Sequence, residues 1–204
     1  MLTRPMLSNA RQAVAKIAEP LARVIDATPI TPNGITMLGL VGTLTAAVFV
    51  AQGKFGIGAA FFVPATFLDL FDGLIARRRG TASRWGAMID SVADRIGEAS
   101  LLIALAYRFR LERPRLAGVA LAALVFSYLV SYVKARAESL GFRCEGGWAE
   151  RPERAILYGT ALLIVGAVEP AMWALAILAA ATVGQRLLMV HRQVAAERAP
   201  DRTP

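Results

Sequence analysis

Long uncharged stretches separated by short charged segments run through most of the chain. No charged residue occurs between Asp26 and Lys54 or between Arg115 and Lys134. Each of these stretches can cross the ~30 Å hydrocarbon core of a bilayer as a helix of about 20 residues. Shorter uncharged stretches cover 55–68, 101–107, 155–168 and 170–185. The pattern predicts an all-α membrane protein with six transmembrane helices, at about 33–52, 55–78, 86–108, 115–138, 154–169 and 170–191.

The segment before the first predicted span is amphipathic rather than spanning. In residues 7–27, Val14, Ile17 and Leu21 fall near one helix face, whereas Arg11 and Lys16 lie elsewhere. Such a helix would lie in the membrane interface; a helix packed on the ends of the bundle explains the pattern equally well. We therefore expect an interfacial segment at 1–30, one membrane domain at 31–192 and a cytoplasmic tail at 193–204.

The charge distribution indicates the orientation of the chain. It has 204 residues, 56% hydrophobic and 19% charged, with a net charge of +8. The basic residues cluster in the N-terminal segment, in the loops after the second and fourth spans, and in the tail. Alternate loops lie on the same side of the membrane, and the positive-inside rule assigns that side to the cytoplasm. A basic protein of this pattern is not expected to bind nucleic acid.

Four carboxylates lie inside two otherwise apolar predicted spans. Asp69 and Asp72 are three residues apart, and Asp90 and Asp94 are four apart, so each pair shares one helix face. Charges at membrane depth are expensive and by default mark a functional site. If the two helices meet along these faces, the carboxylates surround one cavity and require divalent cations, for which Mg²⁺ is the natural choice beside phosphates. The alternative is a set of buried salt bridges to neighbouring arginines.

The motif Asp69-x2-Asp72-Gly73-x2-Ala76-Arg77-x8-Gly86-x3-Asp90-x3-Asp94 resembles the signature of the CDP-alcohol phosphotransferase family. This resemblance implies a six-helix membrane fold, and transfer of a phosphoalcohol unit from a CDP-linked donor to a hydroxyl with release of CMP. It further implies two Mg²⁺ ions, with Mn²⁺ as a possible substitute, and a general base. The implied metal ligands are Asp69, Asp72, Asp90 and Asp94, of which Asp94 is also the base. The implied contacts to CDP are Asn33, Gly73, Arg77 and Ser83; Asn33 stands where some relatives have an aspartate, so metal binding is not expected there.

A second region, Ser131–Glu138 with Gly146–Arg154, is similar to the phosphatidylinositol-phosphate synthases of actinobacteria. The resemblance implies CDP-diacylglycerol and inositol 1-phosphate as substrates, a bacterial plasma membrane location with the site facing the cytoplasm, and a homodimer. A dianionic acceptor phosphate needs cations that an uncharged alcohol would not. The implied pocket residues are Ser131, Lys134, Arg136, Arg154 and Arg186. The alternative role for these cations is to anchor the helices at lipid headgroups.

Two other functions compete with this interpretation. A phosphatidylglycerophosphate synthase of the same family would use glycerol 3-phosphate, which is also anionic. An intramembrane cation transporter would also need buried carboxylates, but it would not explain why Gly73, Arg77 and Gly86 accompany them. Glu98 continues the Asp90–Asp94 face, and we expect it to pair with an arginine rather than bind metal. His191, the only histidine, is expected to be a spectator.

Overall fold

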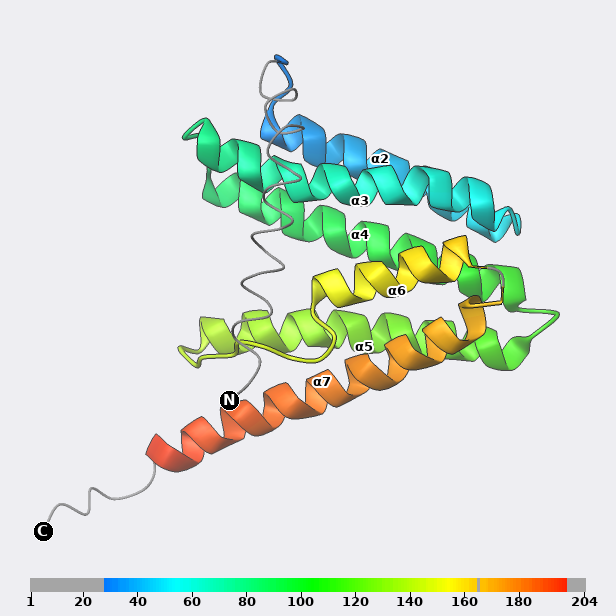
Figure 1. Cartoon of the computed structure of the whole chain (residues 1–204). Helices are drawn as coiled ribbons and strands as arrows, with labels where there is room; N and C mark the ends of the chain where they lie inside the picture. Colours follow the sequence, from blue (N-terminus) through cyan, green and yellow to red (C-terminus); the bar gives the residue numbers. More distant parts are fainter. Residues whose placement is uncertain (1–27, 165, 198–204) are drawn as a thin grey trace, which may run out of the picture.

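The computed structural model describes residues 28–164 and 166–197, which form six helices and no strand (Figure 1). The helices are α2 (Pro32–Ala51), α3 (Phe55–Arg78), α4 (Arg84–Phe109), α5 (Pro114–Ser139), α6 (Arg151–Leu163) and α7 (Val168–Glu197). The predicted all-α class is confirmed, and a helix occurs at each predicted place. The predicted interfacial segment, apart from its last residues, and the end of the tail lie outside the described residues.

Local sequence sets where the helices begin. The Thr31 side chain caps α2 by accepting a hydrogen bond of 3.1 Å from the Gly34 N–H. The Ser83 hydroxyl caps α4 in the same way, accepting a 3.0 Å bond from the Gly86 N–H. Proline occupies the first turn of α2, α5 and α6, where its missing N–H costs nothing.

The fifth helix differs most from its predicted range. It was expected over 154–169, but α6 begins at Arg151 and ends at Leu163. Gly166, with a φ of 85°, lies in the turn that leads to α7, and positive φ is a conformation that glycine adopts at little cost. Because the residues of this turn are apolar like those of the helix before it, hydropathy alone does not mark the boundary.

Four helices, α2, α3, α5 and α7, are long and apolar enough to span a membrane. α4 is long, but its first half carries charged side chains, including Asp90, Asp94, Arg95 and Glu98. α6 has 13 residues, which gives a length of about 20 Å, short of the ~30 Å hydrocarbon core. The polar first half of α4 and the short α6 therefore depend on the other four helices to shield them from lipid.

Close packing through small residues joins α2 to α3 and to α4, the two helices that carry the acidic motif. α2 packs against both α3 and α4, while α5 packs against α7, and α6 contacts α3 and α7 (Figure 1). A Cβ added to Gly42 of α2 would lie 3.0 Å from the Ala65 Cβ of α3, and one added to Gly97 of α4 would lie 3.2 Å from Thr43 of α2. Small residues at such crossings let the backbones approach closely.

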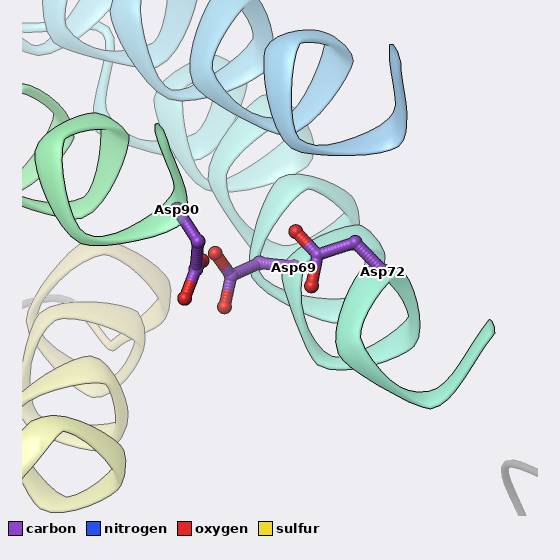
Figure 2. Close-up of side chains that lie close together, drawn as sticks. All are labelled: Asp69, Asp72 and Asp90. Atoms are coloured by element: carbon purple, nitrogen blue, oxygen red, sulfur yellow. The ribbon is translucent and has the colours of Figure 1, made fainter. Parts of the chain in front are cut away.

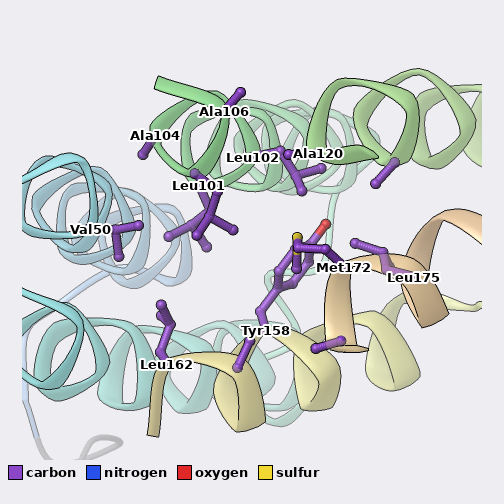
Figure 3. Packing of buried hydrophobic residues seen from close by; sticks show 14 of the residues in the cluster. Val50, Leu101, Leu102, Ala104, Ala106, Ala120, Tyr158, Leu162, Met172 and Leu175 are labelled. Carbon is purple, nitrogen blue, oxygen red and sulfur yellow. The ribbon is translucent and has the colours of Figure 1, made fainter. Parts of the chain in front are cut away.

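The main apolar core fills one end of the bundle. It includes Val50, Leu102, Tyr158, Met172 and Leu175, contributed by α2, α4, α6 and α7 (Figure 3). These residues lie in the last part of α2, α4 and α6 and the first part of α7, which meet at one end because successive helices alternate in direction. The acidic motif and the predicted basic pocket occupy the opposite halves of their helices and therefore lie towards the other end.

Candidate active site

Three carboxylates converge between α3 and α4. Asp69, Asp72 and Asp90 each offer an oxygen, and these oxygens all lie within 4.8 Å of one another (Figure 2). Asp72 is buried, and Asp69 and Asp90 are half-buried. The Asp90 Oδ1 atom is buried and has no hydrogen-bond partner among the described residues. Oxygens of one charge that crowd together, one of them unpaired, fit a divalent cation with oxygen ligands.

α2 and the backbone of α3 hold Asp72 in place. The Thr36 hydroxyl donates to Asp72 Oδ2 over 2.5 Å, and the Gly73 N–H donates to Asp72 Oδ1. Both contacts fix the orientation of the carboxylate. Thr36 was not predicted as a site residue. Its position, one turn into the helix that begins at Pro32, is the only sequence signal that could have indicated it.

The Asp94 carboxylate is paired with arginine side chains. It forms an ion pair with Arg151 of α6 and another, of 3.3 Å, with Arg95. The same Arg151 nitrogen lies 2.5 Å from Asp69 Oδ1. The cluster therefore contains a guanidinium group that the metal-ligand prediction did not include, although Arg151 belongs to the Gly146–Arg154 segment.

The predicted nucleotide contacts fall into two neighbouring groups. A Cβ added to Gly73 would lie 3.4 Å from a guanidinium nitrogen of Arg77, so that glycine leaves open the space beside an exposed arginine. A Cβ added to Gly86 would lie 3.2 Å from both the Asn33 amide oxygen and the Ser83 hydroxyl. The start of α2 thus meets the start of α4, beside the end of α3.

The five residues predicted to form the acceptor pocket differ in their burial and in their hydrogen-bond and ion-pair partners. Among the described residues, the hydrogen bonds and ion pairs of Ser131, Lys134 and Arg136, in the last third of α5, are all with α5 residues, as in the 3.9 Å pair between Lys134 and Glu138. Arg154 is buried: it binds both oxygens of Glu98, at 2.7 and 3.1 Å, and donates to the Ala149 carbonyl.

Arg186 of α7 is buried in a comparable way. It donates to the Val130 carbonyl over 2.5 Å and to the Gly146 carbonyl over 3.1 and 3.2 Å. These bonds attach the loop before α6 to α5 and α7. Glu150, the residue before Arg151, lies 3.7 Å from Arg186, so the basic set continues to the edge of the acidic cluster.

Glu98 is confirmed as a partner for arginine. Besides its two bonds to Arg154, it accepts a 2.9 Å bond from the Tyr158 hydroxyl. Because Glu98 lies one turn after Asp94, and Arg154 nearly one turn after Arg151, α4 and α6 are joined by two successive ion pairs.

Comparison with known proteins agrees with this geometry. The CDP-alcohol phosphatidyltransferase family profile matches residues 29–184. The phosphatidylinositol phosphate synthase of Mycobacterium marinum is 35% identical over 201 residues, covering 93% of this chain and 85% of the relative. The synthase of Corynebacterium glutamicum is 36% identical over 194 residues, covering 90% and 88%.

Two crystal structures of the Mycobacterium tuberculosis phosphatidylinositol phosphate synthase share the fold. One, with CDP-DAG bound, has a TM-score of 0.77 at 34% identity and covers 86% of this chain and 94% of that one. The other, in complex with manganese and citrate, has a TM-score of 0.76 at 34% identity and covers 84% and 88%. With its apolar helices, its acidic cluster and this family match, the chain is an integral membrane enzyme that belongs to the CDP-alcohol phosphatidyltransferase family.

Proposed function

We propose that the chain is a phosphatidylinositol-phosphate synthase, which transfers the phosphatidyl group of CDP-diacylglycerol to inositol 1-phosphate and releases CMP. The observation that carries the proposal is the convergence of Asp69, Asp72 and Asp90 within the family motif. The names of the relatives, which match nearly the whole chain, support the choice of substrates.

Asp69, Asp72 and Asp90 are the proposed ligands of two Mg²⁺ ions, with Mn²⁺ as a substitute, and Asp94 is the fourth. The converging oxygens and the unpaired Asp90 Oδ1 support this assignment, as does the manganese in the M. tuberculosis structure. Bound divalent ions would neutralise the pyrophosphate and the charge that develops on the attacking and leaving oxygens.

Asp94 is the proposed general base. It would accept the proton of the inositol hydroxyl as that oxygen forms a bond to the phosphorus that carries the diacylglycerol. The bond from this phosphorus to the bridging oxygen of the pyrophosphate breaks, and CMP leaves with the electron pair. Asp94 lies on α4 between the acidic cluster and Glu98, whose partner Arg154 belongs to the proposed acceptor side, and a base must reach the hydroxyl that it deprotonates.

The CDP group is proposed to bind between the ends of α2, α3 and α4. Gly73 would let a phosphate approach the backbone, with the Arg77 guanidinium as a charge-assisted donor. Asn33 and Ser83 would contact the nucleoside, and the space that Gly86 leaves between them supports this placement. Ser83 can also keep its capping bond to Gly86, because a hydroxyl both donates and accepts.

The inositol phosphate is proposed to bind beside Ser131, Lys134 and Arg136, which are exposed or half-buried. Arg154 and Arg186 would contribute positive charge from buried positions beside this pocket. Each guanidinium has five N–H donors, so the bonds described for Arg154 and Arg186 leave donors for a phosphate oxygen. Glycerol 3-phosphate would meet the same cations, which makes it the competing acceptor.

The site is proposed to face the cytoplasm of a bacterial plasma membrane, because the basic loops flank the end of the bundle that carries the aspartates. The substrates also favour this side, since inositol 1-phosphate is a charged metabolite. A homodimer is the proposed assembly, supported by the family resemblance alone.

The test is an acceptor comparison with purified protein in nanodiscs that contain CDP-diacylglycerol and Mg²⁺. We expect inositol 1-phosphate to drive CMP release, and glycerol 3-phosphate and unphosphorylated inositol to drive far less. Faster release with glycerol 3-phosphate would overturn the acceptor assignment. Metal flux into liposomes without CMP release would overturn the enzymatic assignment. Asp90→Asn is the inactive control.

A further inference from the structure

Arg151 occupies an unusual place for a cation in this fold. It is the first residue of α6, yet one nitrogen of its guanidinium contacts Asp69 of α3 over 2.5 Å and also pairs with Asp94 of α4. Its side chain is 44% exposed, whereas those of Asp69 and Asp94 are 18% and 7% exposed. The arginine therefore reaches from the open side of the site onto two shielded carboxylates.

A metal ion and the Arg151 guanidinium would compete for the Asp69 carboxylate. Its carboxylate belongs to the converging group with Asp72 and Asp90, and it is also an ion-pair partner of Arg151. A divalent ion bound by Asp69 would lie within a few ångströms of the guanidinium. Like charges at that separation repel strongly where water is partly excluded. Full occupancy of Asp69 by both cations is therefore unfavourable.

Asp94 experiences the same conflict. Its carboxylate is also a proposed metal ligand, and it pairs with both Arg151 and Arg95. A divalent ion bound by Asp94 would again lie close to the Arg151 guanidinium, where like charges repel.

Release of Arg151 does not require α6 to detach. Arg154, nearly one turn further along, binds Glu98 and the Ala149 carbonyl in a buried position. The Ala149 N–H is bonded to Thr182 of α7 over 3.0 Å. The start of α6 therefore stays attached to both α4 and α7 when only the exposed Arg151 side chain moves.

We propose that Arg151 is a competing counter-cation of the metal site, which exchanges with the divalent ion on Asp69 and Asp94. This inference rests on the proposed metal site and adds a regulatory element to it. Arg151 lowers the affinity of the cluster for metal, and metal binding displaces its guanidinium from both carboxylates. The released guanidinium stays beside the site, at the start of the helix that also carries Arg154.

The test is an EPR titration of Mn²⁺ onto the full-length protein in nanodiscs, with no nucleotide or acceptor present. Arg151→Gln removes the competing charge and should tighten Mn²⁺ binding by about tenfold or more, the effect of losing one close repulsion. The matched control is Arg143→Gln, which removes an equal charge from the loop before α6 at an exposed position and should leave the affinity unchanged. Unchanged or weaker Mn²⁺ binding in Arg151→Gln would overturn the proposal, because it would mean that Arg151 only aligns the carboxylates.

A second measurement uses the unaltered protein and so does not depend on the variant folding. Reaction of the Arg151 guanidinium with phenylglyoxal, followed by mass spectrometry, should become faster when Mn²⁺ is added, because the guanidinium leaves Asp69 and Asp94. An unchanged rate of reaction would also overturn the proposal. Neither readout involves turnover. If the acceptor comparison fails while Arg151→Gln still tightens Mn²⁺ binding, the proposed function is wrong and this inference stands.

Discussion

The two halves of the molecule satisfy their charges in opposite ways. In the half formed by α2, α3 and α4, carboxylates of like charge converge, and the buried Asp90 Oδ1 has no hydrogen-bond partner among the described residues. In the half formed by α5, α6 and α7, the buried Arg154 and Arg186 are bonded to carbonyls of the loop before α6, and Arg154 also to Glu98. The acidic half thus requires a cation, whereas the buried arginines of the basic half already stabilise the fold.

This difference separates residues that are expected to bind a ligand from residues that stabilise the structure around the site. A buried group with its own partners is expected to affect stability when it is replaced, and an exposed charge beside the site is expected to affect substrate binding. The variants below test that separation, from the largest expected effect to the smallest.

Asp94→Asn should abolish most turnover. Removal of the proposed base is expected to lower kcat by about 10²–10⁴-fold, the usual contribution of general base catalysis. The measurement is CMP release at saturating substrates. Thermal unfolding is measured alongside to separate lost chemistry from lost stability, because Asp94 is also buried against Arg151 and Arg95, and CDP-diacylglycerol binding is the control that should change little. Activity near that of the unaltered protein would refute the base assignment.

Arg154→Gln should mainly destabilise the fold. It leaves the carboxylate of Glu98 buried without its cation, and breaking a buried ion pair in this way typically costs about 3–5 kcal/mol. The measurement is the free energy of unfolding in detergent. The double variant Arg154→Gln with Glu98→Gln should recover part of the loss, because no unpaired charge remains. A single variant as stable as the original would show that the pair is not a structural element.

Thr36→Val should weaken the acidic cluster without unfolding it. The lost hydrogen bond to Asp72 is worth about 1.5–3 kcal/mol for a charged acceptor. The expected result is lower affinity for Mn²⁺, measured by titration. Thr45→Val is the matched control, because Thr45 lies on the same helix and its hydroxyl donates to the Val41 carbonyl rather than to a carboxylate. Equal Mn²⁺ affinity in the two variants would remove Thr36 from the site.

Lys134→Gln should raise the KM for inositol 1-phosphate about tenfold, equivalent to ~1.4 kcal/mol, through loss of one charge-assisted contact. The KM for CDP-diacylglycerol and the unfolding midpoint should stay the same, because the Lys134 side chain is 41% exposed and its ion pair with Glu138 is long, at 3.9 Å. Arg143→Gln serves again as the charge control. A change in the KM of both substrates would mean that Lys134 acts on the whole site.

The periodicity of the sequence was enough to predict much of this architecture. The i,i+3 and i,i+4 spacings of the aspartates placed each pair on one helix face, and uncharged stretches located the helices to within a few residues over α2 to α5. The capping residues Thr31 and Ser83 explain why the first residues of α2 and α4 could be predicted. The end of α6 could not be predicted, because the apolar turn that follows Leu163 has the same hydropathy as the helix.

Contacts between distant segments could not be derived from one sequence. Arg151 joins residues 82 and 57 positions earlier, and its role depends on how α6 lies against α3 and α4. Thr36 reaches Asp72 only because glycines allow α2 and α3 to pack closely. The burial of Arg186 similarly depends on the path of the loop before α6. The position of Glu98 on its helix face was enough to predict that it pairs with an arginine. The sequence did not indicate that this arginine is Arg154.

The most direct test of the account is Mn²⁺ binding to Asp90→Asn compared with Glu98→Gln, measured by EPR titration of the purified protein. Both variants neutralise a carboxylate on the same face of α4, but only Asp90 belongs to the converging group. The account predicts that Asp90→Asn loses Mn²⁺ binding and that Glu98→Gln keeps it. Equal binding by the two variants would contradict a metal site between α3 and α4.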